Sequence, residues 1–279
     1  MVKRVLRWGL FLAIPLLSAL QMTELPQPVI EAQTYQLGHY QHQVIDGDRL
    51  VLLNWNIHKE LNAAGWRADL AQIQQDHQPT LITLQEANLD ISDPNLPLPA
   101  GFGLEFAANL VLNDSEHAGV ATASREAPSA SQAVFSSVTE PLLASPKLFL
   151  LSEYPLAGRK ETLLVANIHA INFVDKEDYG TQLGQLSMAI SAHDGPLLVV
   201  GDFNSWNPTR LTHLAQLMAQ HQLQPVPFPN PVSSFMGNPL DHVFFSRHFE
   251  LTAADTLDRY DSSDHLPLLV DLKLMPEVQ

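Results

Sequence analysis

Short segments that are nearly continuous in Leu, Val and Ile recur along the chain, and they constrain the fold more than any other feature. Apolar runs of this length predict strands that are covered on both faces. The expected strands are Arg49–Ile57, Thr80–Glu86, Gly119–Ser124, Lys147–Ser152, Glu161–Ile171, Pro196–Gly201, Asp241–Ser246 and Leu266–Leu274. Many strands and few helices predict an α/β fold in which two sheets pack together with helices outside them.

The expected helices lie between these runs. The segments Trp66–Ile73 and Tyr179–Ile190 each place apolar residues on one helical face. Asn207 is typical of a helix N-cap because Pro208 follows at the first helical position, and apolar residues then repeat with helical spacing.

The N-terminus has the composition of a secretory signal. Lys3, Arg4 and Arg7 precede the apolar stretch Trp8–Leu20, which is shorter than the roughly 20 residues of a membrane-spanning helix. We expect export to the periplasm or the medium, or tethering to the inner membrane; a cytoplasmic protein with a buried or frayed N-terminal helix is the alternative. The expected organisation is a signal peptide or anchor in residues 1–22, a linker in 23–48 and one domain in 49–275.

Charge and composition narrow the functional classes. The formal net charge is −15 and there is no cysteine, which excludes disulfides, thiol catalysis and thiolate metal sites. Proteins that hold long nucleic acids usually present basic surfaces. The acidic balance therefore favours small or lipid phosphate esters, although bound cations could let an acidic chain cut a polynucleotide.

Polar residues stand at the ends of the apolar runs. In one group they follow the run, at Asn54–His58, Gln85–Glu86, Asn167–Asn172 and Gly201–Asn204. In a second group, Asp241–His242 and Asp264–His265, they precede it. If the second group of strands runs antiparallel to the first, all of these side chains meet at one edge, as a catalytic site requires.

The residue types at this edge indicate metal-assisted chemistry. Asn56, Glu86 and one or more aspartates offer the hard oxygen ligands that suit Mg²⁺ or Mn²⁺. His169 and His265 could transfer protons near neutral pH.

Direct attack by water is the simplest scheme for such a site. Asp202 could orient or deprotonate the water, and the Asn204 amide could donate to a phosphoryl oxygen. No Ser, Cys or Lys stands out as a covalent nucleophile.

At these positions the chain resembles the endonuclease/exonuclease/phosphatase superfamily of DNase I-like enzymes, and most of all its small bacterial YafD-like branch. The resemblance implies a four-layered α/β sandwich of two mainly antiparallel sheets with flanking helices. The matching segments are Trp55–His58, Gln85–Ala87, Asn167–His169, Gly201–Asn204, Leu240–His242 and Ser263–His265.

The resemblance also implies a role for each residue. The implied catalytic residues are His169, Asp202, Asn204, Asp241 and His265. The implied metal ligands, for Mg²⁺ or Mn²⁺, are Asn56, Glu86 and Asp264. Asn172 and His58 are assigned to substrate binding, His58 at a position where several relatives carry an acid near the metal.

The leading hypothesis is a metal-dependent hydrolase of phosphate esters, a phosphodiesterase or phosphatase, that acts as a monomer. A nuclease would need a basic rim, and the candidates near the site in sequence are Lys59, Arg67, Lys176 and Arg210. A sphingomyelinase-like phospholipid phosphodiesterase would be favoured by an exposed apolar hairpin, which the sequence does not reveal. The non-enzymatic alternative is a binding module on an inactive copy of the fold.

Overall fold

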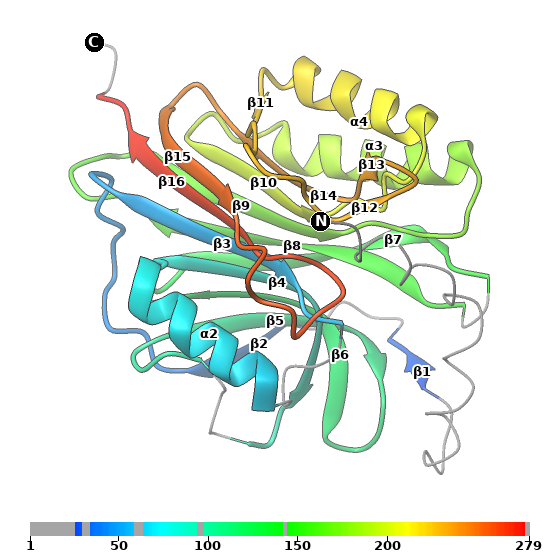
Figure 1. The fold of residues 1–279 in the computed structure, drawn as a ribbon, viewed down its shortest axis with the longest axis horizontal. Helices are drawn as coiled ribbons and strands as arrows, with labels where there is room; N and C mark the ends of the chain where they lie inside the picture. The colour runs from blue at the N-terminus through cyan, green and yellow to red at the C-terminus, as the bar shows by residue number, and fades with distance from the viewer. Residues whose placement is uncertain (1–25, 30–33, 59–63, 94–97, 142–143, 277–279) are drawn as a thin grey trace, which may run out of the picture.

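The computed structural model describes residues 26–29, 34–58, 64–93, 98–141 and 144–276 (Figure 1). The first sheet consists of β1 (Gln27–Pro28), β2 (Thr34–Gly38), β3 (Leu50–Asn56), β4 (Leu81–Asp90), β5 (Gly103–Val111), β6 (Glu116–Ser124), β15 (Phe249–Thr256) and β16 (Leu268–Leu274). Its strand order is β1-β5-β6-β4-β3-β16-β15, and β2 also pairs with β5.

The second sheet has the strand order β11-β14-β10-β9-β8-β7. Its strands are β7 (Ala130–Thr139), β8 (Pro146–Pro155), β9 (Thr162–His169), β10 (Leu197–Asp202), β11 (Gln224–Pro225) and β14 (Asp241–Phe245). A separate hairpin pairs β12 (Ser234–Phe235) with β13 (Asn238–Pro239). The helices are α2 (Ala64–His77), α3 (Lys176–Ile190) and α4 (Pro208–Gln220).

The two sheets stack face to face and helices cover their outer faces, so the expected four-layered sandwich is confirmed (Figure 1). Alternate residues of β3 show why both faces of the strand are apolar. Leu52 packs between the sheets with Val165 of β9, whereas Trp55 packs outward and stacks on Trp66 of α2. On the other side, α3 and α4 cover the second sheet with residues such as Tyr179.

The expected cap at Asn207 is present, and the structure adds a second one. Asn207 accepts a hydrogen bond from Arg210 N–H and caps α4, with Pro208 in the first turn. Asp175 caps α3 by accepting from two backbone N–H groups.

The segment 23–48, expected to be a linker, instead contributes two edge strands to the first sheet. β2 pairs with β5 over Thr34–Gly38, and β1 pairs with the other end of β5. Tyr35 and Leu37 pack on the core while their neighbours face outward, a period-two pattern typical of a half-buried strand. The domain therefore begins before residue 49.

Strands β5, β7 and β15 were not expected from the sequence. β5 is rich in Ala, and β7 and β15 carry many polar residues, so none of them reads as a continuous aliphatic run. The residues 1–22, expected to form a signal or anchor, lie outside the described residues. Among the described helices, none is long and apolar enough to cross a membrane.

Amide side chains replace aliphatic ones in the layer between the sheets as the strands approach one edge. Gln85 of β4 donates to Asn54 Oδ1 at 2.9 Å and to Asn167 Oδ1 at 2.7 Å, and so joins the two sheets. Asn167 Nδ2 in turn donates to the backbone oxygen of Ala121 at 2.8 Å. All three amide residues are fully buried, so their hydrogen bonds fix how the sheets are positioned relative to each other.

We predict that Asn167→Ala lowers the free energy of unfolding by about 3 kcal/mol, because it leaves the buried Gln85 side chain and Ala121 carbonyl of the first sheet without their hydrogen bonds to the second sheet. Urea denaturation followed by circular dichroism measures the change. Gln72→Ala, on the exposed face of α2, is the matched control and should shift stability by less than about 0.5 kcal/mol. Equal stability of the two variants would contradict a structural role for the amide layer.

Candidate active site

The strand directions bring the polar strand ends to one edge of the sandwich, as the sequence predicts. β3 runs parallel to β4 and β9 runs parallel to β10, so the residues that follow these strands lie at the same edge. β14 is antiparallel to β10 and β16 is antiparallel to β3, so the residues that precede them meet the others there.

The site continues the period-two alternation of the inter-sheet layer by one further step. Along β9, Val165 is followed on the same face by Asn167 and then by His169, and along β10 Val200 is followed by Asp202. The layer thus changes from aliphatic to amide to ionisable residues. The ionisable groups therefore lie directly above the hydrogen-bonded amides of Asn54, Gln85 and Asn167.

Glu86 reaches the site through an irregularity in β4. Alternation would place Gln85 and Glu86 on opposite faces, but the pairing of β4 with β6 shifts between Leu84 and Ala87, and Glu86 has a φ of 52°. A non-glycine residue in this region of backbone space is strained and is held there by its surroundings. The bulge explains how Gln85 can join the buried amide layer while the next residue, Glu86, reaches the site histidines.

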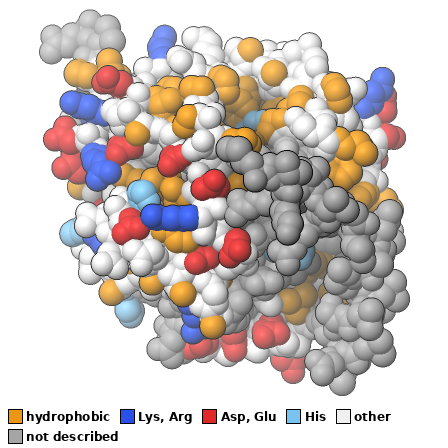
Figure 2. All heavy atoms as spheres, in the orientation of Figure 1, with side chains coloured by type: hydrophobic (Ala, Val, Ile, Leu, Met, Phe, Trp, Pro, Cys, Tyr) orange, Lys and Arg blue, Asp and Glu red, His pale blue; other side chains and the backbone are white. Residues whose placement is uncertain are grey.

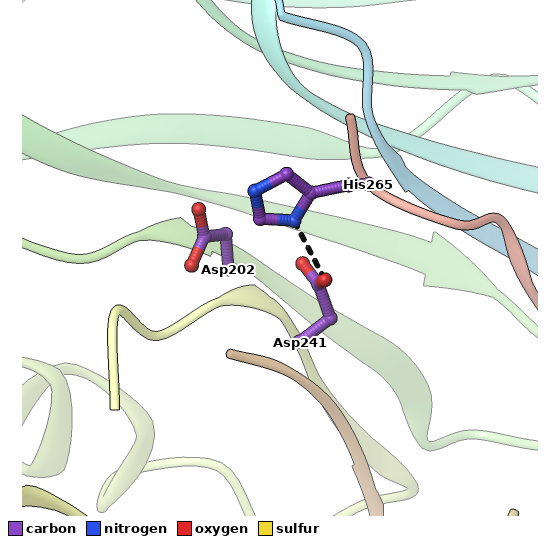
Figure 3. A group of neighbouring side chains, drawn as sticks. All are labelled: Asp202, Asp241 and His265. Carbon is purple, nitrogen blue, oxygen red and sulfur yellow. Dashed lines mark hydrogen bonds and ion pairs between the residues drawn. The ribbon is translucent and has the colours of Figure 1, made fainter. Parts of the chain in front are cut away.

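Asp241 and His265 form the tightest pair of the site, with Asp241 Oδ2 2.7 Å from His265 Nδ1 (Figure 3). Burial alone would lower the pKa of His265, but the charge and hydrogen bond of Asp241, with Asp202 nearby, raise it to about 10. His265 is therefore a cation near neutral pH. Its other ring nitrogen points to the side of the ring on which Asp202 lies.

Asp202 is buried and oriented by amide donors. Its Oδ2 accepts from Asn56 Nδ2 at 2.9 Å, and its Oδ1 accepts from the Asn204 backbone N–H at 2.8 Å. Burial raises the pKa of Asp202 to about 6, with Asp241 adding to the increase, while His265 and the hydrogen bonds act against it. Gly201 precedes it with a φ of 141°, and a Cβ there would lie 2.0 Å from Ile168 O.

His169 lies close to both Glu86 of the first sheet and Asp202 of the second. Its Nε2 lies 3.8 Å from Glu86 Oε1, 3.8 Å from Asp202 Oδ2 and 3.4 Å from Lys147 Nζ. His58 lies at the outer side, with Nδ1 3.8 Å from Glu86 Oε2 and 3.7 Å from Asp264 Oδ1. The carboxylates of Glu86 and Asp264 thus flank one imidazole.

Two groups of residues could hold a metal ion. The first is the set expected from the sequence, Asn56, Glu86 and Asp264, whose carboxylates are partly exposed and make contacts no shorter than 3.7 Å with His58. Partly exposed oxygen donors suit a hydrated Mg²⁺ or Mn²⁺.

The second group is Asp202, Asp241 and His265, whose ligand atoms all lie within 4.8 Å of one another. In this group His265 is protonated and bonded to Asp241, and Asp202 already accepts two hydrogen bonds. A metal would have to displace these contacts and the proton. The oxygen set is therefore the better cation site.

The two asparagines expected to touch substrate are both anchored in loops. Asn172 Oδ1 accepts from Trp206 Nε1 at 2.9 Å, which directs the other end of the amide away from Trp206. Asn204 Nδ2 donates to Ala170 O at 2.8 Å and so joins the ends of β9 and β10. Asn204 thus has a structural role in addition to the one implied by the resemblance.

Arg210, considered above as part of a basic rim, is instead buried beneath the site. Its guanidinium donates to the backbone oxygens of Ile171, Val174 and Asn204 at 2.9–3.0 Å. It also stacks on the rings of Tyr179 and Trp206. Arg210 therefore holds together the loops that present Asn172 and Asn204, and its helical spacing with Leu214 and Met218 was the available sequence signal.

The fold is that of the DNase I-like proteins, and comparison with known proteins agrees. The Endonuclease/Exonuclease/phosphatase family model matches residues 53–265, and the chain belongs to this family. Members of the family are nucleases and phosphatases, generally hydrolases of phosphate esters that often use divalent metals.

Individual relatives place the chain among small bacterial members of the family. A UPF0294 protein of Vibrio campbellii is 39% identical over 238 residues, which cover 84% of this chain and 81% of that protein. An endonuclease/exonuclease/phosphatase from Beutenbergia cavernae has a TM-score of 0.60 at 21% identity, over 82% of this chain and 72% of that one. A Bacteroides thetaiotaomicron mannosyl-6-phosphatase has a TM-score of 0.57 at 17% identity, over 80% and 99% of the two chains.

We predict that the stability gained from His265 is lost as the pH rises from about 6.5 to about 10 in metal-free protein. The pKa of His265 is raised from 6.5 to about 10 in the folded state, so the folded state binds more protons in this range and stability falls with pH. Asp202, with its pKa raised from 3.8 to about 6, titrates below this window.

Urea denaturation in EDTA across this pH range, for wild type and Asp241→Asn, measures the effect. The stability difference between the two proteins should shrink toward high pH, because the variant lacks the carboxylate that retains the proton. If the difference in free energy of unfolding between the two proteins stayed constant from pH 6.5 to 10, His265 would not be charged in the folded state.

Proposed function

We propose that the protein hydrolyses phosphate esters with water as the nucleophile and Mg²⁺ or Mn²⁺ as cofactor. The observation that carries this proposal is the convergence of carboxylates and imidazoles at the end of the inter-sheet layer. The acids are Glu86, Asp202, Asp241 and Asp264, and the imidazoles are His58, His169 and His265.

The excess of carboxylates argues for a cation at the oxygen set. A phosphate anion approaching Glu86, Asp202 and Asp264 would meet repulsion that the protonated His265 offsets only in part. A divalent ion held by Asn56, Glu86 and Asp264 would neutralise charge on the phosphate and polarise its oxygens.

The chain's own groups are arranged for proton transfer. Asp202, with a pKa near 6 and two fixed hydrogen bonds, orients an attacking water and accepts its proton. His265, kept protonated by Asp241, places positive charge beside the phosphoryl oxygens. His169, whose Nε2 lies 3.8 Å from Glu86 Oε1 and 3.4 Å from Lys147 Nζ, contacts the phosphate or the leaving group.

Surface charge supports a small or lipid substrate over a long nucleic acid. On the face drawn in Figure 2, Asp and Glu side chains are interspersed with Lys and Arg and no broad basic area is visible. Of the four basic rim candidates, Arg210 is buried, Lys176 pairs with Glu177, and Lys59 lies outside the described residues. Arg67 remains as an exposed cation on α2. A polyanion would gain little from such a surface.

An exposed hairpin favours a second candidate, a phospholipid phosphodiesterase. The β12–β13 hairpin carries Met236 at its tip with 86% of its surface exposed. Asn238 Nδ2 ties the hairpin to Trp206 O, and Trp206 contacts Asn172, the neighbour of exposed Phe173. The sequence did not reveal this hairpin because each strand has only two residues.

We predict metal-dependent turnover of p-nitrophenyl phosphate or bis-(p-nitrophenyl) phosphate that EDTA abolishes. Glu86→Gln should lower kcat/KM at least about a hundredfold and weaken Mg²⁺ binding in calorimetry, because it removes a charged ligand. Asp202→Ala and His265→Ala should abolish turnover while the circular dichroism spectrum is retained.

Glu250→Gln, on the exposed face of β15, is the matched control and should behave as wild type. A folded wild-type protein that turns over neither ester and binds neither metal would refute the proposal and favour the binding module.

We predict that Met236→Asp lowers turnover of sphingomyelin in vesicles severalfold while leaving bis-(p-nitrophenyl) phosphate hydrolysis unchanged, if the substrate is a lipid. The charge would oppose burial of the hairpin tip in the interface. Met188→Asp, also exposed but near the C-terminal end of α3, is the control. No sphingomyelin turnover, or equal effects of the two variants, would eliminate the lipid candidate.

A further inference from the structure

A lysine that the sequence left unassigned lies at the edge of the site. Lys147 is the second residue of β8, and the next residue, Leu148, pairs with His169 of β9. Its Nζ is 3.4 Å from His169 Nε2, and its side chain is only 15% exposed. Lys147 therefore reaches into the site from the second sheet.

Glu140 connects this lysine to the loop that carries Asn172. Glu140 Oε1 lies 3.8 Å from Lys147 Nζ and accepts the backbone N–H of Asn172 at 2.9 Å. The carboxylate thus holds the lysine next to Asn172 as well as His169. The family resemblance implies a catalytic role for His169 and substrate binding by Asn172.

The contacts of the Lys147 ammonium are too long for a complete ion pair and leave room for an anion. A lysine ammonium has three N–H donors. Within the described part of the chain its contacts in the site are the 3.4 Å one to His169 and the 3.8 Å one to Glu140, both longer than charge-assisted hydrogen bonds of about 2.7–2.9 Å. A phosphate oxygen would complete this coordination.

Charges of both signs surround His169. Glu86 Oε1 and Asp202 Oδ2 each lie 3.8 Å from His169 Nε2, and Lys147 Nζ lies 3.4 Å from the same atom. A divalent ion at the oxygen set would neutralise part of the charge of a bound phosphate. Lys147 would add positive charge for a further phosphate oxygen.

We propose that Lys147 binds a non-bridging oxygen of the scissile phosphate and biases the site toward phosphomonoesters. This inference rests on the proposed phosphoesterase function. A point charge attracts a phosphomonoester, which carries nearly two negative charges near neutral pH, more strongly than a phosphodiester, which carries one.

The test compares Lys147→Gln, Lys147→Arg and the control Lys176→Gln, which removes an exposed lysine at the start of α3. Calorimetry measures the affinity of the Mg²⁺-loaded protein for inorganic phosphate. Steady-state kinetics measure kcat/KM for p-nitrophenyl phosphate and bis-(p-nitrophenyl) phosphate. We expect Lys147→Gln to weaken phosphate binding by about ten- to a hundredfold, the worth of a hydrogen bond to a charged group.

The monoester should lose more kcat/KM than the diester in Lys147→Gln, and Lys147→Arg should restore most of both losses by restoring the charge. Glu140→Gln distinguishes phosphate binding by Lys147 from a structural role of the ion pair, because it breaks the ion pair but keeps the lysine. It should lose less phosphate affinity than Lys147→Gln, whereas a purely structural ion pair predicts equal losses in the two variants.

Unchanged phosphate affinity in Lys147→Gln, with active wild type, would overturn the inference and leave the proposed function standing. A wild-type protein that binds no phosphate and hydrolyses no ester would overturn both. An equal loss for monoester and diester would overturn the monoester preference.

Discussion

The hydrogen-bonded layer of amides between the sheets is the interaction on which the site depends. Gln85 donates to Asn54 within its own sheet and to Asn167 across the interface. Apolar contacts between two flat faces tolerate small sliding, but buried amides leave unpaired donors and acceptors when the sheets move. Glu86 and His265, which belong to the first sheet, and His169, Asp202 and Asp241, which belong to the second, are thereby held in fixed relative positions.

The same layer sets the electrostatics of the residues above it. Asp202 is buried among protein atoms rather than water, so its carboxylate is easier to protonate and is a better base near neutral pH. His265 shares this burial yet remains charged, because Asp241 lies 2.7 Å from its ring. Two environments a few ångströms apart thus produce a base and a cation from ordinary side chains.

The sequence predicted the parts of the molecule that follow from strand periodicity. Aliphatic runs identified the central strands, and polar residues at their ends identified Asp202 and His265, because parallel and antiparallel neighbours share one edge. The edge strand β2 and the bulge at Glu86 depend on pairing partners distant in sequence, so local patterns did not show them. Lys147 was missed because a charged residue at a strand entry is usually solvated, and only the pairing of β8 with β9 brings it to His169.

The locations of two basic residues make the surface of the protein more acidic than its composition alone indicates. Arg210 counts as a surface charge in the sequence, but its guanidinium is bonded to three backbone oxygens beneath the site. Lys147 is also mostly buried, and its ammonium lies 3.4 Å from His169 Nε2. Since these cations are withdrawn from the surface, the outer surface attracts polyanions even less than the net charge of −15 indicates. Under the proposed function, Lys147 and His265 would concentrate positive charge at one phosphate group, which favours a substrate recognised through that group.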